Sequence, residues 1–156
     1  MVETIEGQKL EEKIIEIRRV STGNKAENSL SFTAMVVVGN RAGLVGVSVG
    51  KAPDVRAAIE KGASRAKKNL IEVPLREGTI PFPVEVKRGA AHIVLRPRPS
   101  GSGISVGGSI RNVVELAGIK DISGKILGTR NKPSNVHAVL QAFEKLRKLS
   151  SRYGAK

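Results

Sequence analysis

The chain contains no cysteine and no tryptophan, and it has only three phenylalanines and one tyrosine among its 156 residues. The lack of cysteine excludes disulfide bonds and thiolate zinc sites. The scarcity of aromatic rings argues against a binder of single-stranded nucleic acid, because such proteins stack bases on aromatic side chains. No apolar run reaches the ~18 residues of a membrane span. The first residues are acidic rather than apolar, so we expect no signal peptide and a cytoplasmic location.

Acidic residues are also few, 14 against 27 Lys and Arg. Residues 1–16 hold five of the acids and two of the bases, which leaves nine acids, 25 bases and a net charge of +16 on residues 17–156. A compact domain with this charge repels itself. Binding to a polyanion is therefore favourable in free energy, because each neutralised phosphate releases counterions. Nucleic acid is therefore the leading partner. The alternative is a charged surface that only keeps the protein soluble.

Alternating apolar and polar residues predict an antiparallel sheet in the first half of the chain. The expected strands cover residues 14–20, 30–38 and 44–50. Residues 21–29 are polar and predict an exposed loop. Apolar residues at helical spacing then predict a helix over 55–70, with Asp54 as its cap. Residues 10–73 are thus expected to form one unit of three strands and a helix, after a flexible acidic terminus at 1–9.

Prolines and glycines at 74–83 predict a linker to a second unit. This unit is expected to hold a hairpin at 84–96, a helix at 109–117, a strand at 122–127 and a final helix capped by Ser134. Gly118 fits the position just past the end of the first of these helices. The second unit is therefore an α+β domain over 84–150, followed by a basic tail at 151–156.

Basic side chains in both units are candidate contacts for RNA. On the predicted helix, Lys61, Arg65 and Lys68 lie together beside the apolar face, and Glu60 is the only acid between residues 55 and 70. We favour phosphate contact for these three over a merely solvated face. The whole set of RNA-binding candidates is Arg18, Arg19, Lys25, Arg41, Lys51, Lys61, Arg65, Lys68, Arg96 and Arg98.

Two glycine-rich loops imitate nucleotide-binding motifs without matching them. Residues 46–52 have three residues between their glycines where a phosphate loop needs four, and Ala52 replaces the hydroxyl that would bind magnesium. Residues 101–107 are one residue too long for the dinucleotide fingerprint. The second loop still predicts a backbone anion site or a protein interface. Its candidate residues are Gly101, Gly103, Gly107, Gly108 and Arg111. Alternatively, the glycines only allow close packing.

No catalytic group stands out from the sequence. The two histidines, His92 and His137, are far apart, and no acidic pair has the spacing of metal ligands. We therefore expect no catalytic residue, no metal and no cofactor.

Several motifs occur in a fixed order along the chain. They are Phe32-Thr33-Ala34, Val36–Gly39, Val45-Gly46, Gly50-Lys51-Ala52, Ala66–Ile71, Val73–Leu75, Gly78–Pro81, Gly101–Arg111 and Leu116–Ile119. With them the chain resembles the small-subunit ribosomal protein S-five family over roughly residues 10–150. The Gly107-Gly108 pair and Lys125–Gly128 are similar to the bacterial or organellar branch.

The resemblance implies a first domain like a double-stranded-RNA-binding domain and a second α+β sandwich with a βαβ unit. It implies a structural protein, neither an enzyme nor a homo-oligomer, that binds ribosomal RNA where the body of the small subunit meets the head. It also implies contacts with ribosomal proteins S-four and S-eight, a place near the messenger-RNA entry channel, and a role in decoding accuracy. The glycine loop would face S-four.

Two other functions stay open from the residues alone. One is a phosphotransferase or nuclease that uses residues 101–108, and the other is a double-stranded-RNA binder that acts off the ribosome. The chain also departs from the family pattern, since Lys25-Ala26-Glu27-Asn28 replaces Lys-Gly-Gly-Arg. Phe82 and Arg98 replace the usual His and Ala, and one extra residue separates Asn131 from Asn135.

Overall fold

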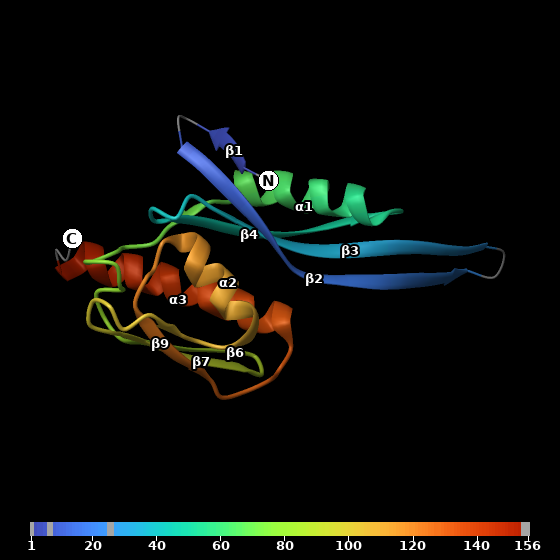
Figure 1. Cartoon of the computed structure of the whole chain (residues 1–156). Helices are drawn as coiled ribbons and strands as arrows, with labels where there is room; N and C mark the ends of the chain where they lie inside the picture. The colour runs from blue at the N-terminus through green and yellow to red at the C-terminus, as the bar shows by residue number, and fades with distance from the viewer. Residues whose placement is uncertain (1, 6–7, 25–26, 154–156) are drawn as a thin grey trace.

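A computed structural model describes residues 2–5, 8–24 and 27–153, which form two α+β units (Figure 1). The first unit is a five-stranded antiparallel sheet of order β1-β2-β3-β4-β5 with one helix. Its elements are β1 (Val2–Ile5), β2 (Gln8–Asn24), β3 (Glu27–Gly39), β4 (Leu44–Ala52), α1 (Val55–Lys68) and β5 (Ile71–Glu72). The predicted α+β class is confirmed, and the three expected strands are the centre of this sheet.

The second unit has a four-stranded sheet of order β6-β7-β9-β8 and two helices. Its elements are β6 (Val84–Arg88), β7 (Ala91–Pro97), β8 (Ile104–Ser105), α2 (Gly108–Ala117), β9 (Ile122–Ile126) and α3 (Lys132–Tyr153). Because β8 and β9 are parallel and α2 connects them, they form the expected βαβ unit. Gly118 ends α2 in the left-handed conformation, with φ 95°, as the sequence predicted.

Three predicted boundaries are wrong. The loop expected at 21–29 is instead strand on both sides of residues 25–26, with Ser21 opposite Leu30 and Asn24 opposite Glu27. Within the terminus expected to be flexible, Val2–Ile5 form β1 and pair with residues 8–11 of β2. Backbone pairing needs no apolar side chains, so an alternation pattern does not detect these polar stretches.

The third error concerns the ends of α3. Its cap is Asn131, whose Oδ1 accepts a hydrogen bond from the Ser134 backbone N–H at 3.0 Å, so Ser134 lies inside the helix. The tail expected at 151–156 is helical as far as Tyr153.

The segment predicted as a linker, residues 74–83, packs onto the second unit. Arg76 and Thr79 pair across a two-residue turn in which Glu77 and Gly78 have φ of 51° and 83°. Positive φ at both central residues is typical of a type I′ turn. The Gly78 carbonyl then accepts the Lys120 N–H at 2.7 Å. The flanking Val73 and Ile80 are 2% and 1% exposed.

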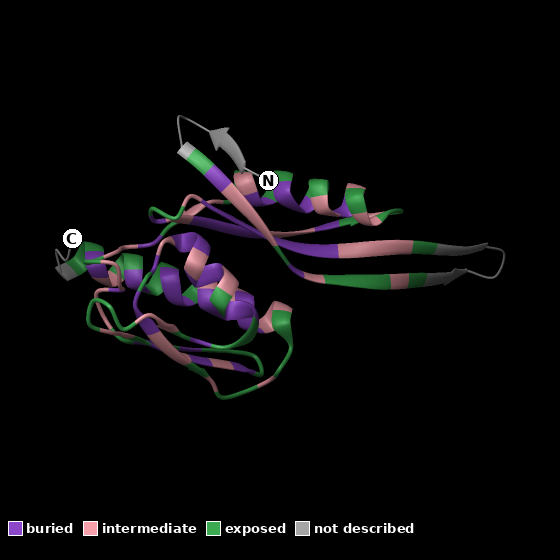
Figure 2. Ribbon diagram, in the orientation of Figure 1, coloured by how far each residue is buried: buried purple, intermediate pink, exposed green. Residues whose placement is uncertain are grey.

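The two faces of the first sheet are both buried. Ala34, Val36 and Val38 pack against α1, where Gly50 and Gly62 let the helix lie directly on β4. On the other face, Met35 and Val37 join a core that continues into the second unit. The helices α2 and α3 therefore lie between the two sheets, and the chain has four layers (Figures 1 and 2).

The contact between the units is made by backbone as well as by apolar side chains. Arg41 N–H donates to the Leu116 carbonyl and Gly43 N–H donates to the Ala117 carbonyl, each at 2.9 Å. A β-bulge at Ile15 turns that side chain into the shared core, where it is 8% exposed, while Ile14 is 44% exposed. These bonds fix the β3–β4 turn to the end of α2, so the two units pack against each other and share one core.

Candidate nucleic-acid interface

The strands β2 and β3 run beyond the rest of the sheet as a two-stranded arm (Figure 1). The last pair between β3 and β4 is Phe32 with Ala52, and past it β3 pairs only with β2 in the described part of the chain. Arg18 and Arg19 lie at the base of this arm and are exposed. Arg18 Nε donates to Glu16 Oε2 at 3.0 Å. Of the predicted contacts on the arm, Lys25 lies outside the described residues.

Three of the predicted basic residues form a cluster where α1 crosses the open end of β4. Only Leu44 and Val45 of β4 pair with β5, so the later carbonyls of β4 lie at an edge. Arg65 Nη1 donates to the Val49 carbonyl at 3.1 Å, and Lys61 Nζ approaches the Lys51 carbonyl at 3.4 Å. We call Lys51, Lys61 and Arg65 the α1–β4 cluster.

The side chains of this cluster are exposed, and each retains N–H donors. An arginine has five such donors and a lysine three, so a single bond to a carbonyl leaves most of them available to a phosphate. Lys68 is exposed farther along α1. In contrast, Lys67 lies under the helix, where it pairs with Glu12 of β2 at 3.4 Å and both side chains are 13% exposed. Phosphate contact by Lys61, Arg65 and Lys68 stays a prediction, and the structure shows only that these three side chains are exposed.

Arg41, Arg96 and Arg98 lie elsewhere. Arg41 is on the β3–β4 turn, where its Nε donates to Glu11 Oε2 at 2.8 Å. Arg96 is on β7, on the other side of the α2–α3 layer from α1 (Figure 1). Arg98 is half-buried, and its backbone N–H lies 3.4 Å from Thr79 Oγ1. The predicted RNA contacts therefore lie on more than one surface of the molecule.

The glycine loop does bind an anion through its backbone, but the anion is the chain's own Asp121. Gly101 N–H and Gly103 N–H both donate to Asp121 Oδ1, at 3.1 and 2.9 Å, and Asp121 is 5% exposed. These two amides are therefore not available to an external phosphate. The pattern missed this contact because Asp121 is 18 residues beyond Gly103, outside any local turn motif.

Gly107 and Gly108 are different, because both are exposed and no atom lies within 4 Å of a Cβ placed on either. Gly107 is the cap position of α2 and supplies no side-chain hydrogen bond to the helix. This part of the loop offers bare backbone to a partner, so the protein-interface alternative for it stays a prediction.

Arg111 belongs to an ion-pair cluster that joins the two units. Its Nε donates to Glu115 Oε1 at 3.0 Å, and Lys13 Nζ of β2 donates to Glu115 Oε2 at 2.6 Å. The hydrogen bond from Lys13 is the main cause that holds the pKa of Glu115 below its usual range, and Arg111 adds to it. Arg111 itself is 56% exposed, so a partner can still reach its guanidinium. The sequence offered no local signal for this cluster, since Lys13 and Glu115 are 102 residues apart.

The two histidines occupy separate places. His92 hydrogen-bonds Glu85, and this bond lowers the pKa of Glu85. Burial, with the nearby Arg88 charge, lowers the pKa of His137. In the described ranges, no three His, Asp or Glu side chains come together as metal ligands would. No helix in those ranges is long and apolar enough to cross a membrane.

The chain matches two described domains of one protein family. Residues 10–74 match "Ribosomal protein S5, N-terminal domain" and residues 86–153 match "Ribosomal protein S5, C-terminal domain". It is 44% identical to "Small ribosomal subunit protein uS5c" of Cyanophora paradoxa, over 90% of this chain and 83% of the relative. It is 47% identical to "Small ribosomal subunit protein uS5" of Acaryochloris marina, over 90% of this chain and 80% of the relative. Together these matches show that the chain belongs to the ribosomal protein S5 family.

Proposed function

We propose that the chain is a structural constituent of the small ribosomal subunit and binds its ribosomal RNA through the α1–β4 cluster and the β2–β3 arm. The names of the relatives, both small ribosomal subunit proteins, support a place in the small subunit. The choice of this RNA-binding surface is supported by the exposed Lys61 and Arg65, whose side chains bond carbonyls along the open edge of β4.

The anchoring explains why these cations suit RNA. A free lysine or arginine loses side-chain entropy when it contacts a phosphate. Arg65 is already held by the Val49 carbonyl, so part of this cost is met when the protein folds. The only acid on α1 is Glu60, which lies 3.5 Å from Arg56, so it does not neutralise the cluster. Binding then depends on the phosphate backbone and has little dependence on sequence.

The arm extends the interface beyond the sheet. Its base carries Arg19, which is exposed and makes no ion pair with another described residue. A narrow two-stranded arm can enter a groove or junction of folded RNA that a whole sheet cannot. We propose that the arm contacts RNA where the body of the subunit meets the head, as the sequence resemblance implied.

The exposed end of the glycine loop is proposed to face a protein. Gly107 and Gly108 allow a neighbour to approach the backbone, and Arg111 adds a fixed charge. Ribosomal protein S-four is the partner that the resemblance implied for this loop, and S-eight is a second neighbour. Effects on decoding accuracy and on the messenger-RNA entry channel would follow from this contact. The proposed location is the ribosome. The phosphotransferase or nuclease alternative has no support here, because the loop amides hold Asp121.

The test is binding of the purified full chain to small-subunit ribosomal RNA at several salt concentrations. Replacing Lys61, Arg65 and Lys68 with Ala should flatten the log–log dependence of affinity on salt by about one unit per lost contact. The matched control replaces Lys120, Arg147 and Arg152, three exposed cations elsewhere, and should leave the slope unchanged. An unchanged slope in the α1 variant would contradict the proposed surface.

A further inference from the structure

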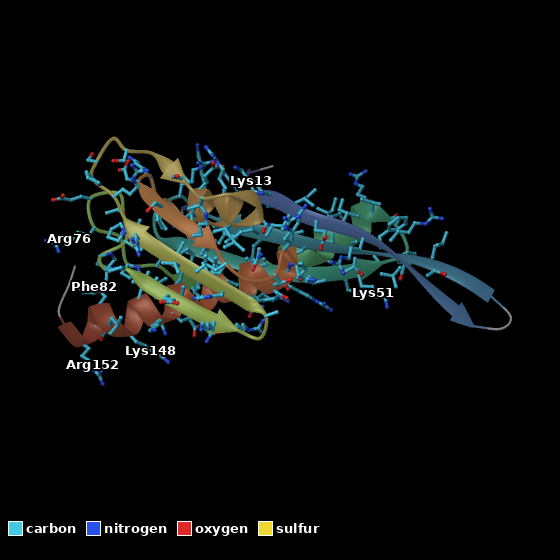
Figure 3. The ribbon with its side chains drawn as sticks, turned by 90° about the horizontal axis from the view of Figure 1, so that it is seen from below. Lys13, Lys51, Arg76, Phe82, Lys148 and Arg152 are labelled. Atoms are coloured by element: carbon cyan, nitrogen blue, oxygen red, sulfur yellow. The ribbon has the colours of Figure 1, made fainter. Side chains whose placement is uncertain are left out.

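The second sheet has one covered and one open face. Val86, Ile93 and Leu95 point into the core beneath α2 and α3. The opposite face has no element over it in the described chain. Figure 3 looks onto this face and shows β6, β7 and β9 in front of the helices. A sheet with one uncovered face leaves a surface that a partner can contact directly.

A cavity of about 360 Å³ lies on this open face. Its polar lining residues are Arg96 of β7, Ser105 of β8, and Ser123 and Lys125 of β9. The register explains why they meet, because Ser123 pairs with Arg96 on one side and with Ser105 on the other. Lys125 lies opposite Val94, one step along the same face.

Among the residues that the structure describes, the lining contains cations and hydroxyls but no carboxylate. In residues 2–5, 8–24 and 27–153, none of the four polar side chains makes a side-chain hydrogen bond or an ion pair. The nearest acid by register is Glu85, opposite Val94, and it is bonded to His92. The positive charge of the cavity is therefore not neutralised within the described chain, unlike that of Arg111 or Arg18.

We propose that this cavity binds the sugar–phosphate backbone of a second RNA segment. The proposal rests on the RNA-binding function above and adds a site to it. Arg96 and Lys125 are diagonal neighbours on adjacent strands, which places them about 7–8 Å apart, with their Cβ atoms somewhat closer. Both can thus reach the phosphates of one backbone segment, while Ser105 and Ser123 exchange hydrogen bonds with phosphate oxygens or a 2′-hydroxyl.

The apolar part of the lining fits the same ligand. Val94 and Leu127 complete the cavity wall, and Leu127 is 53% exposed, so they can contact a ribose. None of the described residues that line the cavity is aromatic, so these residues offer no ring on which a base could stack, unlike sheets that read single strands. The site therefore recognises the RNA backbone and not its sequence.

The position of the cavity gives it a distinct role. The α2–α3 layer separates this face from the first sheet and α1 (Figure 1). One RNA segment on the α1–β4 cluster and another on the second sheet would lie on opposite sides of one rigid body. The chain would then hold two RNA segments at a fixed separation.

The experiment uses the full chain and purified small-subunit ribosomal RNA. The double variant Arg96→Gln with Lys125→Gln should reduce the salt slope by about 1.4–1.8 units, since each lost phosphate contact contributes about 0.7–0.9. The matched control, Lys87→Gln with Lys148→Gln, removes the same charge from exposed sites outside the cavity and should keep the wild-type slope. Thermal melting should be the same for all three proteins, because the substituted side chains are exposed.

Each other outcome has a defined meaning. If the cavity variant keeps the wild-type slope while the α1 variant loses slope, the cavity proposal fails and the proposed function stands. If both variants keep the wild-type slope, the cavity proposal and the proposed RNA-binding function both fail. If the cavity variant binds RNA normally but no longer enters subunits reconstituted with the other ribosomal proteins, the cavity faces a protein and the RNA proposal is overturned.

Discussion

Gly39 at the end of β3 lies against the carbonyl of Leu116 in α2 so closely that a methyl group on Gly39 would overlap that oxygen. The approach allows the neighbouring Arg41 N–H to bond the same carbonyl at 2.9 Å. Glycine is thus required here by contact between the two units, and the core they share depends on it.

Gly39→Ala should lower the free energy of unfolding by about 1–3 kcal/mol, as overpacking of a tight contact does. The change forces α2 away from the sheet. Urea denaturation measures it. The control is Gly107→Ala, where the new methyl group has no atom within 4 Å, and the expected cost is about 0.5–1 kcal/mol because alanine caps a helix less well than glycine. Equal stabilities for the two variants would show that the units are not held together at Gly39.

Asp121→Ala should loosen the glycine loop without unfolding the chain. The substitution leaves the Gly101 and Gly103 amides without their acceptor, at a cost of about 1–3 kcal/mol. Hydrogen exchange at these two amides should become faster, while exchange in α1 stays unchanged. Asp121→Asn keeps a carbonyl oxygen as acceptor, so its exchange rate at these amides should lie between those of wild type and Asp121→Ala. Wild-type exchange in Asp121→Ala would mean that the carboxylate does not order the loop.

The Lys13–Glu115–Arg111 cluster should make stability depend on pH in the acid range. The pKa of Glu115 is lowered from 4.5 in the folded chain. Its contribution is therefore fully present above about pH 4.5 and is lost as the pH falls through the lower folded value. Glu115→Gln should cost about 0.5–1 kcal/mol at pH 7, and the difference from wild type should shrink towards pH 3.

Urea midpoints between pH 3 and pH 7 would measure this effect. The control is Glu60→Gln, which removes a carboxylate that is 68% exposed and should give a nearly constant difference. A Glu115→Gln difference that does not change with pH would exclude an electrostatic link between the units at this position.

The far part of the β2–β3 arm should be weakly protected in the free protein and strongly protected on the subunit. Between Ser21 and Asn24, and between Glu27 and Leu30, each strand pairs only with the other. A two-stranded ribbon is marginally stable alone. Hydrogen exchange of these amides, free and assembled, measures the difference. Equal protection in both states would contradict docking of the arm on RNA.

Residue spacing and capping residues were enough to predict elements such as α1, which is determined by interactions between residues close in sequence. The helix α1 has its apolar spacing and its Asp54 cap, whose Oδ1 accepts the Ala57 N–H at 2.6 Å. The strand β5 was missed because it has two residues and no alternation to detect. Asn131 was missed as the cap of α3 because Ser134 has equal propensity, and only the geometry distinguishes them.

The core shared by the two units depends on long-range contacts, and so do the bonds of the Gly101 and Gly103 amides to Asp121. A signal for the core was present, since residues 34–38 are apolar without interruption, and a strand of that kind is buried on both faces. No comparable signal links Asp121 to Gly101 or Lys13 to Glu115. Apart from the three residues on one face of α1, the candidate RNA contacts were chosen by charge, so the sequence could not divide them between the α1–β4 cluster, the β3–β4 turn and the second sheet.

Sedimentation tests the central claim most directly. A tagged copy of the chain, expressed in cells that carry its own ribosomes, should migrate with small subunits on a sucrose gradient after a high-salt wash. Ribonuclease treatment should release it, because the proposed attachment is to RNA. If the chain stays at the top of the gradient in high salt, or remains bound after the RNA is digested, the proposed role as an RNA-bound constituent of the small subunit is contradicted.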